Sequence, residues 1–504
     1  MSSNAVTNRS ARVVGQTVPA LGGGVLPLIV LTAVAVVLRT LYLSSKSLTL
    51  DEGFSAFLAR TNFAEFIHTI WHTELNMSLY YVLLRLWMHL GVGVFWMRLL
   101  SVVFGVATVP VIYFLGLRLF NRRTATVAAL LVVLHPAHVA LSQDARSYSL
   151  VVLLVSVSSL LFLRTIENPS RLNWAGYAVV TALALYAHFF AALVILAQAV
   201  SLVIAKVERP ARRALLKAAL VIAVLGAPIL VFLLRLPRLE LAWVPQLHWQ
   251  QALDVLYSLT LSKYRAVTYL VLWASAIGAA VSRSSSRASR WPYWFVLSWL
   301  FVPFAVTAAA STVRPLLVER FLAICIPASV LLAAAGFDFL LARSRLIAAV
   351  VLMLLVLYSA RSLRFSYTHP DINDDWRSAT AYVLAHAQAK DEVVVLPAYA
   401  RFTFDYYLDR SGASAPDLQI TSDVPAASSS PTSQAFWFLS SDFPATGAGE
   451  AQIAEFLKRH QEYCEAPPAT FTRVRVWDLR WCKVEHDAGS PGQINPDRSS
   501  ATKQ

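Results

Sequence analysis

Long apolar runs separated by short polar segments dominate the first 360 residues of the chain. A helix that crosses a bilayer needs about 20 predominantly apolar residues, and on that basis the pattern predicts about eleven membrane spans. We expect these spans at residues 25–43, 98–117, 124–141, 148–164, 174–190, 191–206, 214–234, 266–282, 292–310, 320–341 and 345–360. The pattern therefore indicates a polytopic α-helical membrane protein.

The first two spans are separated by a long loop, residues 44–97, whose apolar positions recur at helical spacing in "GFSAFLARTNFAEFIHTIW" and "SLYYVLLRLWMHLG". Amphipathic helices of this kind lie along a membrane surface. Residues 235–265 form a second stretch of this type, with Trp and Tyr side chains that are typical of interfacial anchors.

The composition changes after residue 361, where segments such as "DWRSATAYVLAHAQ" and "DEVVVLP" alternate helix-like and strand-like periods. We predict a small α/β domain over residues 371–483, outside the membrane. Cys464 and Cys482 lie in it, and either a disulfide or two buried thiols is compatible with the sequence. The N-terminal tail, residues 1–24, is expected in the cytoplasm, and the polar segment 484–504 is expected to be disordered.

The composition supports the membrane interpretation. The chain is 57% hydrophobic and 14% charged, whereas a soluble protein is about 25% charged. The net charge of +14 raises the possibility of nucleic-acid binding, but the basic residues are scattered between apolar runs and form no single patch. A site for nucleic acid is therefore not indicated.

Charge separates the predicted loops into two sets. One set is basic and nearly free of acid, which by the positive-inside rule places it in the cytoplasm. The other set is acidic and faces outward, and an odd number of spans then places the C-terminal domain outside as well. The first apolar run lacks a small-residue cleavage site and is read as an uncleaved span. The sequence thus predicts a multi-pass protein of the cell (inner or plasma) membrane with a cytoplasmic N-terminus and a periplasmic or extracytoplasmic C-terminal domain.

Carboxylates of the outward loops occur at three places: the pair Asp51–Glu52, Glu74 in "WHTELNMSLYY", and Asp144 in "LSQDARSYSL". Each taken alone is compatible with a solvated helix end or a local ion pair, because charge at the end of a span costs little. Taken together with nearby cations, they indicate a charged site at the outer face. The candidate cations are Arg85, Arg98, Arg146 and Arg320.

Several stretches resemble the GT-C glycosyltransferases of the protein-mannosyltransferase and aminoarabinose-transferase type, glycosyltransferase families 39 and 83. The matching segments are "LDEGFSA", "HTELNMSLYYVLLRLWMHLG", "LSQDARSYSL", "LYAHFFAALVILAQ" and "LLVERFLAICIPASVLLAA", and "DWRSATAYVLAHA" with "FDYYL" resembles the tail domain of some members. The resemblance implies a GT-C fold and transfer of a sugar from a polyprenyl-phosphate carrier to a lipid, glycan or protein of the cell envelope. Met77 and Ser78 stand where the family usually has two prolines.

The resemblance matches Asp51 to the family's Asp, which implies a general base. A lipid phosphate leaves as a weak base, so it needs cations and no general acid. One carboxylate that accepts the acceptor's proton in a single displacement predicts an inverting reaction. Glu52 is expected to orient an Arg or cap a turn, and Arg146 and Arg320 are candidates for the phosphate. For Arg320, an ion pair with its neighbour Glu319 is an equal alternative.

Three other residues are candidates for substrate contact: Glu74, Asp144 and His188. With Asp51, the carboxylates of Glu74 and Asp144 suit a divalent cation by their chemistry, although their spacing has no metal-specific pattern. A divalent metal therefore stays an open possibility. The pair Tyr80–Tyr81 is expected to anchor at the interface or pack in the core.

A transporter or flippase of a lipid-linked sugar or another small molecule is the main alternative function. Proton relays in transporters reach the bilayer midplane, whereas the predicted span interiors are almost free of acid and Asp338 lies near a cytoplasmic end. No Walker A motif, Rossmann glycine fingerprint or zinc-type Cys/His spacing is present in the sequence. The donor is therefore expected to be lipid-linked and not a nucleotide sugar.

Overall fold

The computed structural model describes residues 25–203, 205, 207–235, 263–282, 287–369, 374–412, 416–421, 435–441, 455, 458, 463–465 and 468–481. The chain divides into two compact units, Met1–Asp375 and Trp376–Gln504. Both predicted tails and most of the predicted interfacial stretch 235–265 lie outside the described residues.

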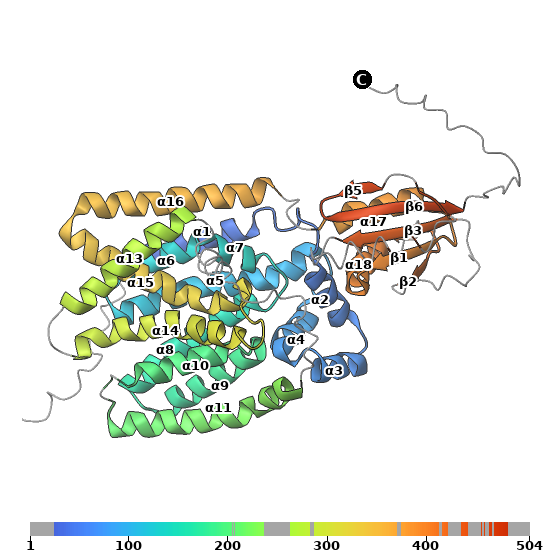
Figure 1. Cartoon of the computed structure of the whole chain (residues 1–504). Helices are drawn as coiled ribbons and strands as arrows, with labels where there is room; N and C mark the ends of the chain where they lie inside the picture. The colour runs from blue at the N-terminus through green and yellow to red at the C-terminus, as the bar shows by residue number, and fades with distance from the viewer. Residues whose placement is uncertain are drawn as a thin grey trace, which may run out of the picture. The chain divides into compact units, whose positions relative to one another are not determined.

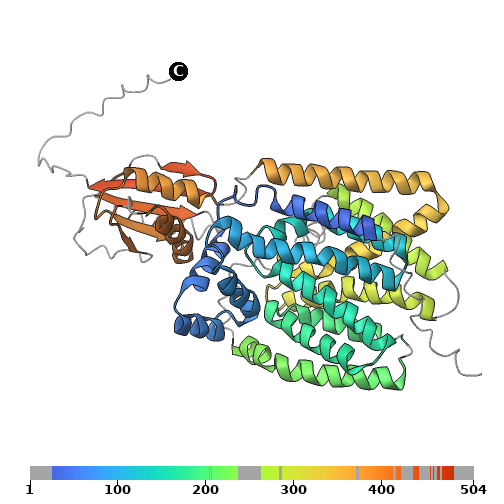
Figure 2. The same cartoon turned by 180° about the vertical axis from the view of Figure 1, so that it is seen from behind.

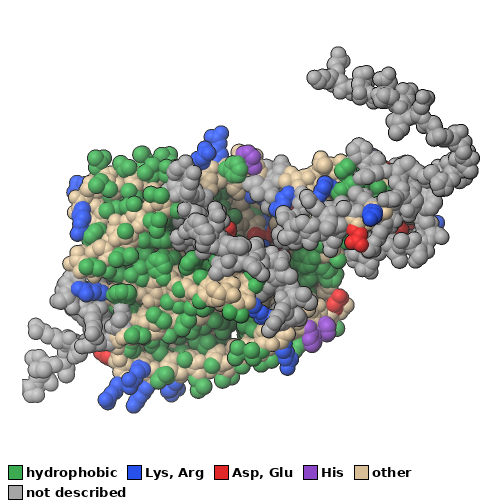
Figure 3. Space-filling model, viewed as in Figure 1, with side chains coloured by type: hydrophobic (Ala, Val, Ile, Leu, Met, Phe, Trp, Pro, Cys, Tyr) green, Lys and Arg blue, Asp and Glu red, His purple; other side chains and the backbone are tan. Residues whose placement is uncertain are grey.

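The first unit is a bundle of long helices that lie side by side (Figures 1 and 2). Hydrophobic side chains cover the face of the bundle shown in Figure 3, and Lys and Arg side chains lie at its margins. The helices are α1 (Val25–Thr40), α5 (Val94–Leu119), α6 (Arg122–Val133), α7 (Pro136–Ser142), α8 (Tyr148–Glu167), α9 (Arg171–Ala187), α10 (Ala191–Ser201), α11 (Arg209–Arg235), α13 (Lys263–Ser282), α14 (Arg287–Ser311), α15 (Ile326–Arg343) and α16 (Arg345–Thr368), with a 3-10 helix η4 (Glu319–Cys325) before α15.

Among the described residues, seven helices are long and apolar enough to cross a membrane, or eight if the bent pair α6–α7 is one span. Helices α1 and α10 are apolar but have only 16 and 11 residues. The prediction of about eleven spans is therefore not confirmed, because several apolar runs fold as short or broken helices. The prediction of a mostly helical, multi-pass membrane protein stands.

The break between α6 and α7 is stabilised by an arginine of the first helix. Pro136 cannot donate a backbone hydrogen bond, which interrupts the helical ladder, and the two helices meet at 58°. Arg39 is 0% exposed and donates to the carbonyl of Val132 at 3.1 Å, and its Nη2 lies 2.8 Å from Nδ1 of His138. The carbonyl groups that the break releases thus find a partner, and α7 leaves the break in a fixed direction.

The long loop between α1 and α5 holds helices α2 (Leu50–Arg60), α3 (Phe63–His72) and α4 (Ser78–Trp87), with a 3-10 turn η2 (Leu75–Met77), so the predicted helices of this loop are confirmed. Arg85 donates to the carbonyls of Ala59 and Thr61 and stacks over Phe66 with its Cζ 4.8 Å from the ring centroid. Arg85 therefore closes the turn between α2 and α3 and has a structural contact of its own.

The second unit is built on one mixed sheet with strand order β2-β1-β3-β6-β4, and β5 pairs with β6. Strand β1 is parallel to β2 and β3, and β6 is antiparallel to β3. Val394, Phe438, Trp477 and Leu479 form its core. The elements are α17 (Trp376–His386), β1 (Glu392–Leu396), α18 (Arg401–Arg410), β2 (Gln419–Thr421), β3 (Ala435–Ser441), β4 (Tyr463–Glu465), β5 (Ala469–Phe471) and β6 (Val474–Trp481).

A small C-terminal domain with helices and a sheet is therefore present. The backbone of Cys464 lies in β4. The question of a disulfide between Cys464 and Cys482 falls outside the side chains that the structure describes.

Candidate active site

The first element of the site is a buried ion pair at the start of α2. Glu52 is 1% exposed, and both of its carboxylate oxygens accept from Arg98, at 2.7 Å each. Glu52 also accepts from the backbone N–H of Thr49 at 3.0 Å, which closes a capping box, and from that of Ala145 at 2.9 Å. Glu52 thus joins α2, α5 and the loop that carries Asp144.

The pKa of Glu52 follows from these contacts. Burial favours the neutral carboxyl, but the charge and hydrogen bonds of Arg98 and the two backbone donors outweigh it and hold the pKa of Glu52 below its ordinary value. Arg98 is equally enclosed, because its remaining donors bond the carbonyls of the segment before α2. These carbonyls belong to Leu43, Lys46 and Ser47 at 2.9, 3.1 and 2.9 Å. Both partners are therefore fully engaged by protein groups.

The neighbouring carboxylate, Asp51, lies in a different environment. Its side chain is 24% exposed and accepts from Nη1 of Arg320 at 2.8 Å, and the Arg320 side chain is 33% exposed. Arg320 comes from η4, 269 residues further along the chain, and its Cζ lies 5.8 Å from the ring centroid of Tyr148. The sequence offered a donor phosphate or Glu319 as the partner of Arg320, so the pair with Asp51 is a contact that the sequence did not indicate. This pair is open enough for a substrate to reach it.

Arg146 lies next to this pair and leads to Glu74 through a tyrosine. Its Nη1 donates to the hydroxyl of Tyr81 at 2.8 Å and lies 3.4 Å from the backbone carbonyl of Asp51. Tyr81 in turn donates to Oε2 of Glu74 at 3.1 Å. Tyr81 is 0% exposed, so interfacial anchoring is wrong for this residue. In the sequence, Tyr81 lies four residues before Arg85, and this spacing did not indicate that its hydroxyl bonds charged groups.

Asp144 follows α7, and one of its carboxylate oxygens lies in an unusual environment. Its Oδ1 is buried and makes no hydrogen bond with any residue that the structure describes. Burial and the negative charge of Glu52 raise the pKa of Asp144 to about 7, against the opposing effect of Arg146 and with a further contribution from Asp51. Near neutral pH this group can accept or donate a hydrogen bond to a bound hydroxyl.

His188 lies between α9 and α10 and is 1% exposed. Its ring packs against Tyr148 and Phe321, with centroid distances of 6.0 and 5.0 Å. Nδ1 accepts from the backbone N–H of Phe190 at 3.3 Å, and Nε2 has no hydrogen-bond partner among the described residues. The loop that carries His188 is bonded to η2, because the backbone N–H of Phe189 donates to the side-chain oxygen of Asn76 at 2.8 Å.

These contacts connect the candidate residues chosen from the sequence into one region of the first unit. The same residues do not form a metal site. Among the residues that the structure describes, no group of three or more His, Cys, Asp or Glu side chains is placed to hold a metal ion. Asp51 is engaged by Arg320 and Glu74 by Tyr81. The donor set of Asp51, Glu74 and Asp144 thus does not fit a shared cation in this arrangement.

A second buried polar group was missed in the sequence. Arg265, near the start of α13, is 1% exposed, and its Nε and Nη1 have no hydrogen-bond partner among the described residues. Its Cζ lies 5.9 Å from the ring centroid of Tyr269, whose ring is 6.4 Å from that of His135. A buried guanidinium with spare donors is suited to an anion. The signal was available, since "LSKYRAVTYL" places an arginine at the outward end of a predicted span.

The chain has the GT-C fold, which it shares with a class of membrane proteins. ArnT from Cupriavidus metallidurans in the apo state is 15% identical over 89% of this chain and 97% of that chain, with a TM-score of 0.59. The same protein bound to undecaprenyl phosphate is 16% identical, with coverages of 91% and 98% and a TM-score of 0.58. The archaeal oligosaccharyltransferase AglB from Archaeoglobus fulgidus, in complex with an inhibitory peptide and a dolichol-phosphate, is 12% identical, with coverages of 92% and 75% and a TM-score of 0.54.

One segment of the sequence also matches a family model. Residues 78–232 match the family model described as dolichyl-phosphate-mannose-protein mannosyltransferase. This segment contains Arg98, Asp144, Arg146 and His188. A search of curated proteins found no match. The resemblance to the GT-C glycosyltransferases that the sequence motifs indicated is therefore confirmed.

Proposed function

We propose that the protein is a membrane glycosyltransferase that moves a sugar from a polyprenyl-phosphate carrier to an acceptor hydroxyl at the outer membrane face. The observation that carries this proposal is the accessible Asp51–Arg320 pair beside Arg146 and Asp144, in a chain with the GT-C fold. The undecaprenyl phosphate bound to ArnT supports a lipid-linked donor. The family match over residues 78–232 supports a glycosyl transfer.

The proposed reaction is a single displacement at the sugar C1. The acceptor oxygen forms a bond to C1 while the C1–O bond to the carrier phosphate breaks, and the bonding pair leaves with the phosphate oxygen. Asp51 takes the acceptor's proton, and the configuration at C1 inverts because there is one displacement. No general acid is needed, because the departing phosphate is a weak base that the cations Arg320 and Arg146 neutralise.

The pairing of Asp51 with Arg320 suits both tasks. A guanidinium has five N–H donors in a planar fork, so Arg320 can keep its bond to Asp51 and bind a phosphate oxygen with its other donors. Because both side chains are partly exposed, neither has to break a buried contact when the donor binds.

The remaining residues are proposed to position this pair or contact the substrates. Glu52 holds α2 and the Asp144 loop in register through Arg98 and Ala145. Glu74, through Tyr81, orients Arg146. Oδ1 of Asp144 and Nε2 of His188, which bond none of the residues that the structure describes, are available for substrate hydroxyls, and Arg265 is a further candidate for a phosphate.

The active site is proposed to face outward from the inner or plasma membrane, with the N-terminus in the cytoplasm and the C-terminal domain on the far side. The positive-inside distribution of Lys and Arg supports this orientation. In a chain whose three native cysteines are replaced, Ser45→Cys should react with an impermeant maleimide added outside intact cells, and Arg122→Cys should not. The reverse pattern of labelling would overturn the orientation.

The base is tested with the full chain purified in detergent, a polyprenyl-phosphate sugar and a panel of lipid, glycan and peptide acceptors. We expect Asp51→Asn to lower turnover about 1,000-fold, in the range of general-base catalysis, with an unchanged thermal unfolding midpoint. Glu65→Gln is the matched control, since Glu65 lies in the same loop and its contacts with Asn62 at the start of α3 are those of a helix cap. Full turnover by Asp51→Asn would refute the base, and translocation of the sugar lipid across liposomes without bond cleavage would favour a flippase.

A further inference from the structure

Helix α3, in the loop between α1 and α5, carries two histidines on the face that points away from the protein. Phe66 and Ile70 anchor the buried face of this helix and are 2% and 7% exposed. His68 and His72 each follow one of these residues by two positions. Successive residues on a helix are rotated by about 100°, so both imidazoles lie about 200° from the buried face. Both histidines are exposed.

The helix that presents this pair is fixed at both ends. At its start, the side-chain oxygen of Asn62 accepts from the backbone N–H of Glu65 at 2.9 Å. At its end, the hydroxyl of Thr73 donates to the carbonyl of Thr69 at 2.7 Å. Sites that are built on helices hold their geometry better than sites on loops. The two histidines therefore lie on a defined scaffold.

The two imidazole rings are close enough to share one ion. Residues four apart are neighbours on a helix surface, and the ring centroids of His68 and His72 are 4.5 Å apart, with 39° between the ring planes. A metal–nitrogen bond of about 2.1 Å puts the ion about 3.2 Å from a ring centroid, so two imidazoles bound at a right angle have centroids about 4.6 Å apart. The observed spacing matches this value.

The nitrogens of both rings are available to a ligand. Within the part of the chain that the structure describes, neither imidazole has a hydrogen-bond partner. Imidazole is the most common metal ligand in proteins and suits copper, nickel and zinc, and the spacing His-x-x-x-His is that of a helical zinc motif. Glu65, one turn before His68, accepts instead from the side chain of Asn62 at 3.2 Å and is not a ligand in this arrangement.

A site with two protein ligands differs from a structural or catalytic metal centre, which has four or three. No group of three or more His, Cys, Asp or Glu side chains is placed to hold an ion among the residues that the structure describes. Two imidazoles leave the other coordination positions to water, so the ion exchanges with the solution. By the general order of affinities for divalent metals, Cu²⁺ is expected to bind most tightly.

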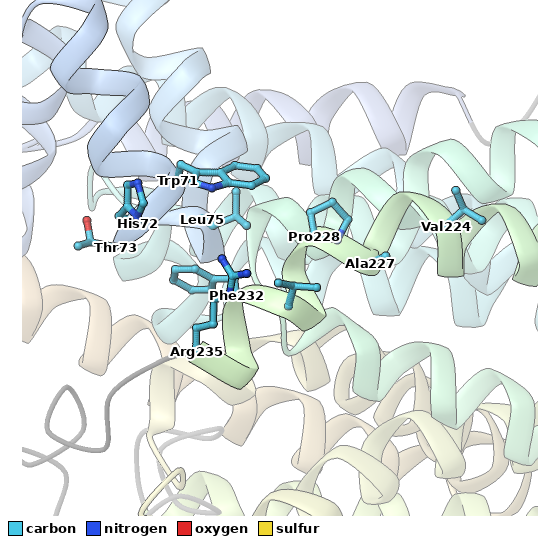
Figure 4. Close-up of a pocket in the computed structure, with 10 residues that line it drawn as sticks. Trp71, His72, Thr73, Leu75, Val224, Ala227, Pro228, Phe232 and Arg235 are labelled. Atoms are coloured by element: carbon cyan, nitrogen blue, oxygen red, sulfur yellow. The ribbon is translucent and has the colours of Figure 1, made fainter.

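The pair lies at the rim of a groove of about 700 Å³ between the end of α3 and the outward half of α11 (Figure 4). His72 lines this groove together with Trp71, Phe232 and Arg235. The walls are mostly apolar, and no carboxylate is among the described residues that line them. The groove thus adds no carboxylate ligand, and an ion that is bound by the histidines fixes the last turn of α3 at its rim.

We propose that His68 and His72 bind one divalent transition-metal ion of the Cu²⁺, Ni²⁺ and Zn²⁺ group at the exposed face of α3. The ion bridges two residues that are one helical turn apart and stabilises the last turn of the helix. This inference goes beyond the proposed glycosyl transfer and does not depend on it, because binding of the ion needs neither donor nor acceptor.

The test uses the full chain, purified in detergent with a tag that contains no histidine, and Cu²⁺ as the probe. We expect titration calorimetry to show one strong site, and the electron paramagnetic resonance spectrum of the bound Cu²⁺ to show two imidazole nitrogens. His68→Ala and His72→Ala should each weaken binding at least about 10-fold, since even the loss of an outer-shell partner costs about 10–100-fold. His89→Ala, which removes another exposed histidine of the same loop, should bind like the unmodified protein.

A second variant tests the spacing of the pair. Thr69→His/His72→Thr keeps the number of histidines but puts them at adjacent positions, which do not face each other on a helix, so it should also bind at least about 10-fold more weakly. Unchanged binding by this variant or by either alanine variant would overturn the proposal, as would a spectrum with a single nitrogen ligand. Loss of binding in Asp51→Asn would place the ion at the candidate active site and would overturn the proposal too.

Discussion

Asp51 and Glu52 are adjacent at the start of α2, but their carboxylates lie in different environments. Glu52 is 1% exposed, and both of its oxygens are bound by Arg98 and backbone N–H groups. The Asp51 side chain is 24% exposed and accepts from Arg320, whose side chain is 33% exposed. Successive residues on a helix point about 100° apart, so one turn of helix sends one carboxylate into the protein and the other toward substrate.

The difference in exposure assigns the two carboxylates different roles. A buried, fully bonded carboxylate cannot take up a proton without breaking several contacts, which suits a positioning role. An accessible carboxylate beside a cation stays ionised and can meet a new hydroxyl, which suits a base. Arg98→Met and Arg320→Gln test this division directly, and Tyr81→Phe and Asp144→Asn test the groups around the open pair.

The largest effect is expected from Arg98→Met. It leaves Glu52 charged and buried without its partner, which costs about 3–5 kcal/mol of folding free energy. We expect most of the protein to be lost as aggregate on solubilisation, which size-exclusion chromatography in detergent measures. The double variant Glu52→Gln/Arg98→Met should recover part of the monodisperse yield, and a normal yield for Arg98→Met alone would contradict the structural role of the pair.

Arg320→Gln should act on the reaction and leave the fold intact. The loss of one charge-stabilising donor lowers catalysis by about 100-fold, so we expect kcat to fall by that factor with a thermal midpoint close to that of the unmodified protein. Arg320→Lys should recover only part of the rate, because a lysine lacks the planar fork. An effect confined to the yield of folded protein would place Arg320 with Arg98 as a structural cation.

Tyr81→Phe is expected to have an intermediate effect. It removes the hydroxyl that bonds both Arg146 and Glu74, and hydrogen bonds to charged groups contribute about 1.5–3 kcal/mol. We predict a loss of about 10-fold in kcat/KM, measured with saturating donor and varied acceptor. Tyr80→Phe is the control, since the Tyr80 hydroxyl bonds Ser101 instead. Equal losses in both variants would show that packing matters and the Arg146–Glu74 link does not.

The smallest effect concerns pH and Asp144. Burial and the charge of Glu52 raise the pKa of Asp144 from 3.8 to about 7 in the folded protein. The folded state therefore holds this proton more tightly, and the stability it contributes is present below about pH 4 and lost as the pH rises to about 7. Asp144→Asn removes this titration. The thermal midpoint of Asp144→Asn minus that of the unmodified protein should therefore be about 2 °C larger at pH 8 than at pH 5.

Tryptophan fluorescence during heating measures these midpoints in detergent. Glu65→Gln, whose carboxylate lies at an exposed cap, serves as the control with a difference that stays constant across the same pH range. A constant difference for Asp144→Asn as well would contradict the raised pKa of Asp144.

Much of the fold could be predicted because apolar runs are long where helices are long. The runs at 98–117, 148–164 and 345–360 each lie inside one helix. The number of spans could not be predicted, because hydropathy does not report a break such as that before Pro136, and a run shared by α9 and α10 offers no polar boundary. The strand order of the second unit depends on pairings between distant segments, which local patterns do not contain.

The candidate residues were chosen from the charges of short outward loops, and the structure connects them through contacts that the sequence does not show. Asp51 and Arg320 are 269 residues apart, and no local pattern links them. Tyr81 was expected to anchor at the interface or pack in the core, and no local pattern indicated that its hydroxyl joins Arg146 and Glu74. Arg265 was passed over because a basic residue at a span end is ordinarily a solvated anchor.

Arg39 has a consequence for biosynthesis. It is a cation in the first apolar helix, and the carbonyl groups that it bonds, at Val132 and Val133, lie 93 and 94 residues later. At a translation speed of about 5–20 residues per second, the nascent helix waits on the order of 5–20 s for these partners. Arg39 lies in the last turn of this helix, where a charge costs less than at the bilayer centre, so the helix can be inserted before its partners exist. The buried contacts of Arg39 with Val132 and His138 form only after α6 and α7 have been synthesised, and the packing of the first helix is completed at that stage.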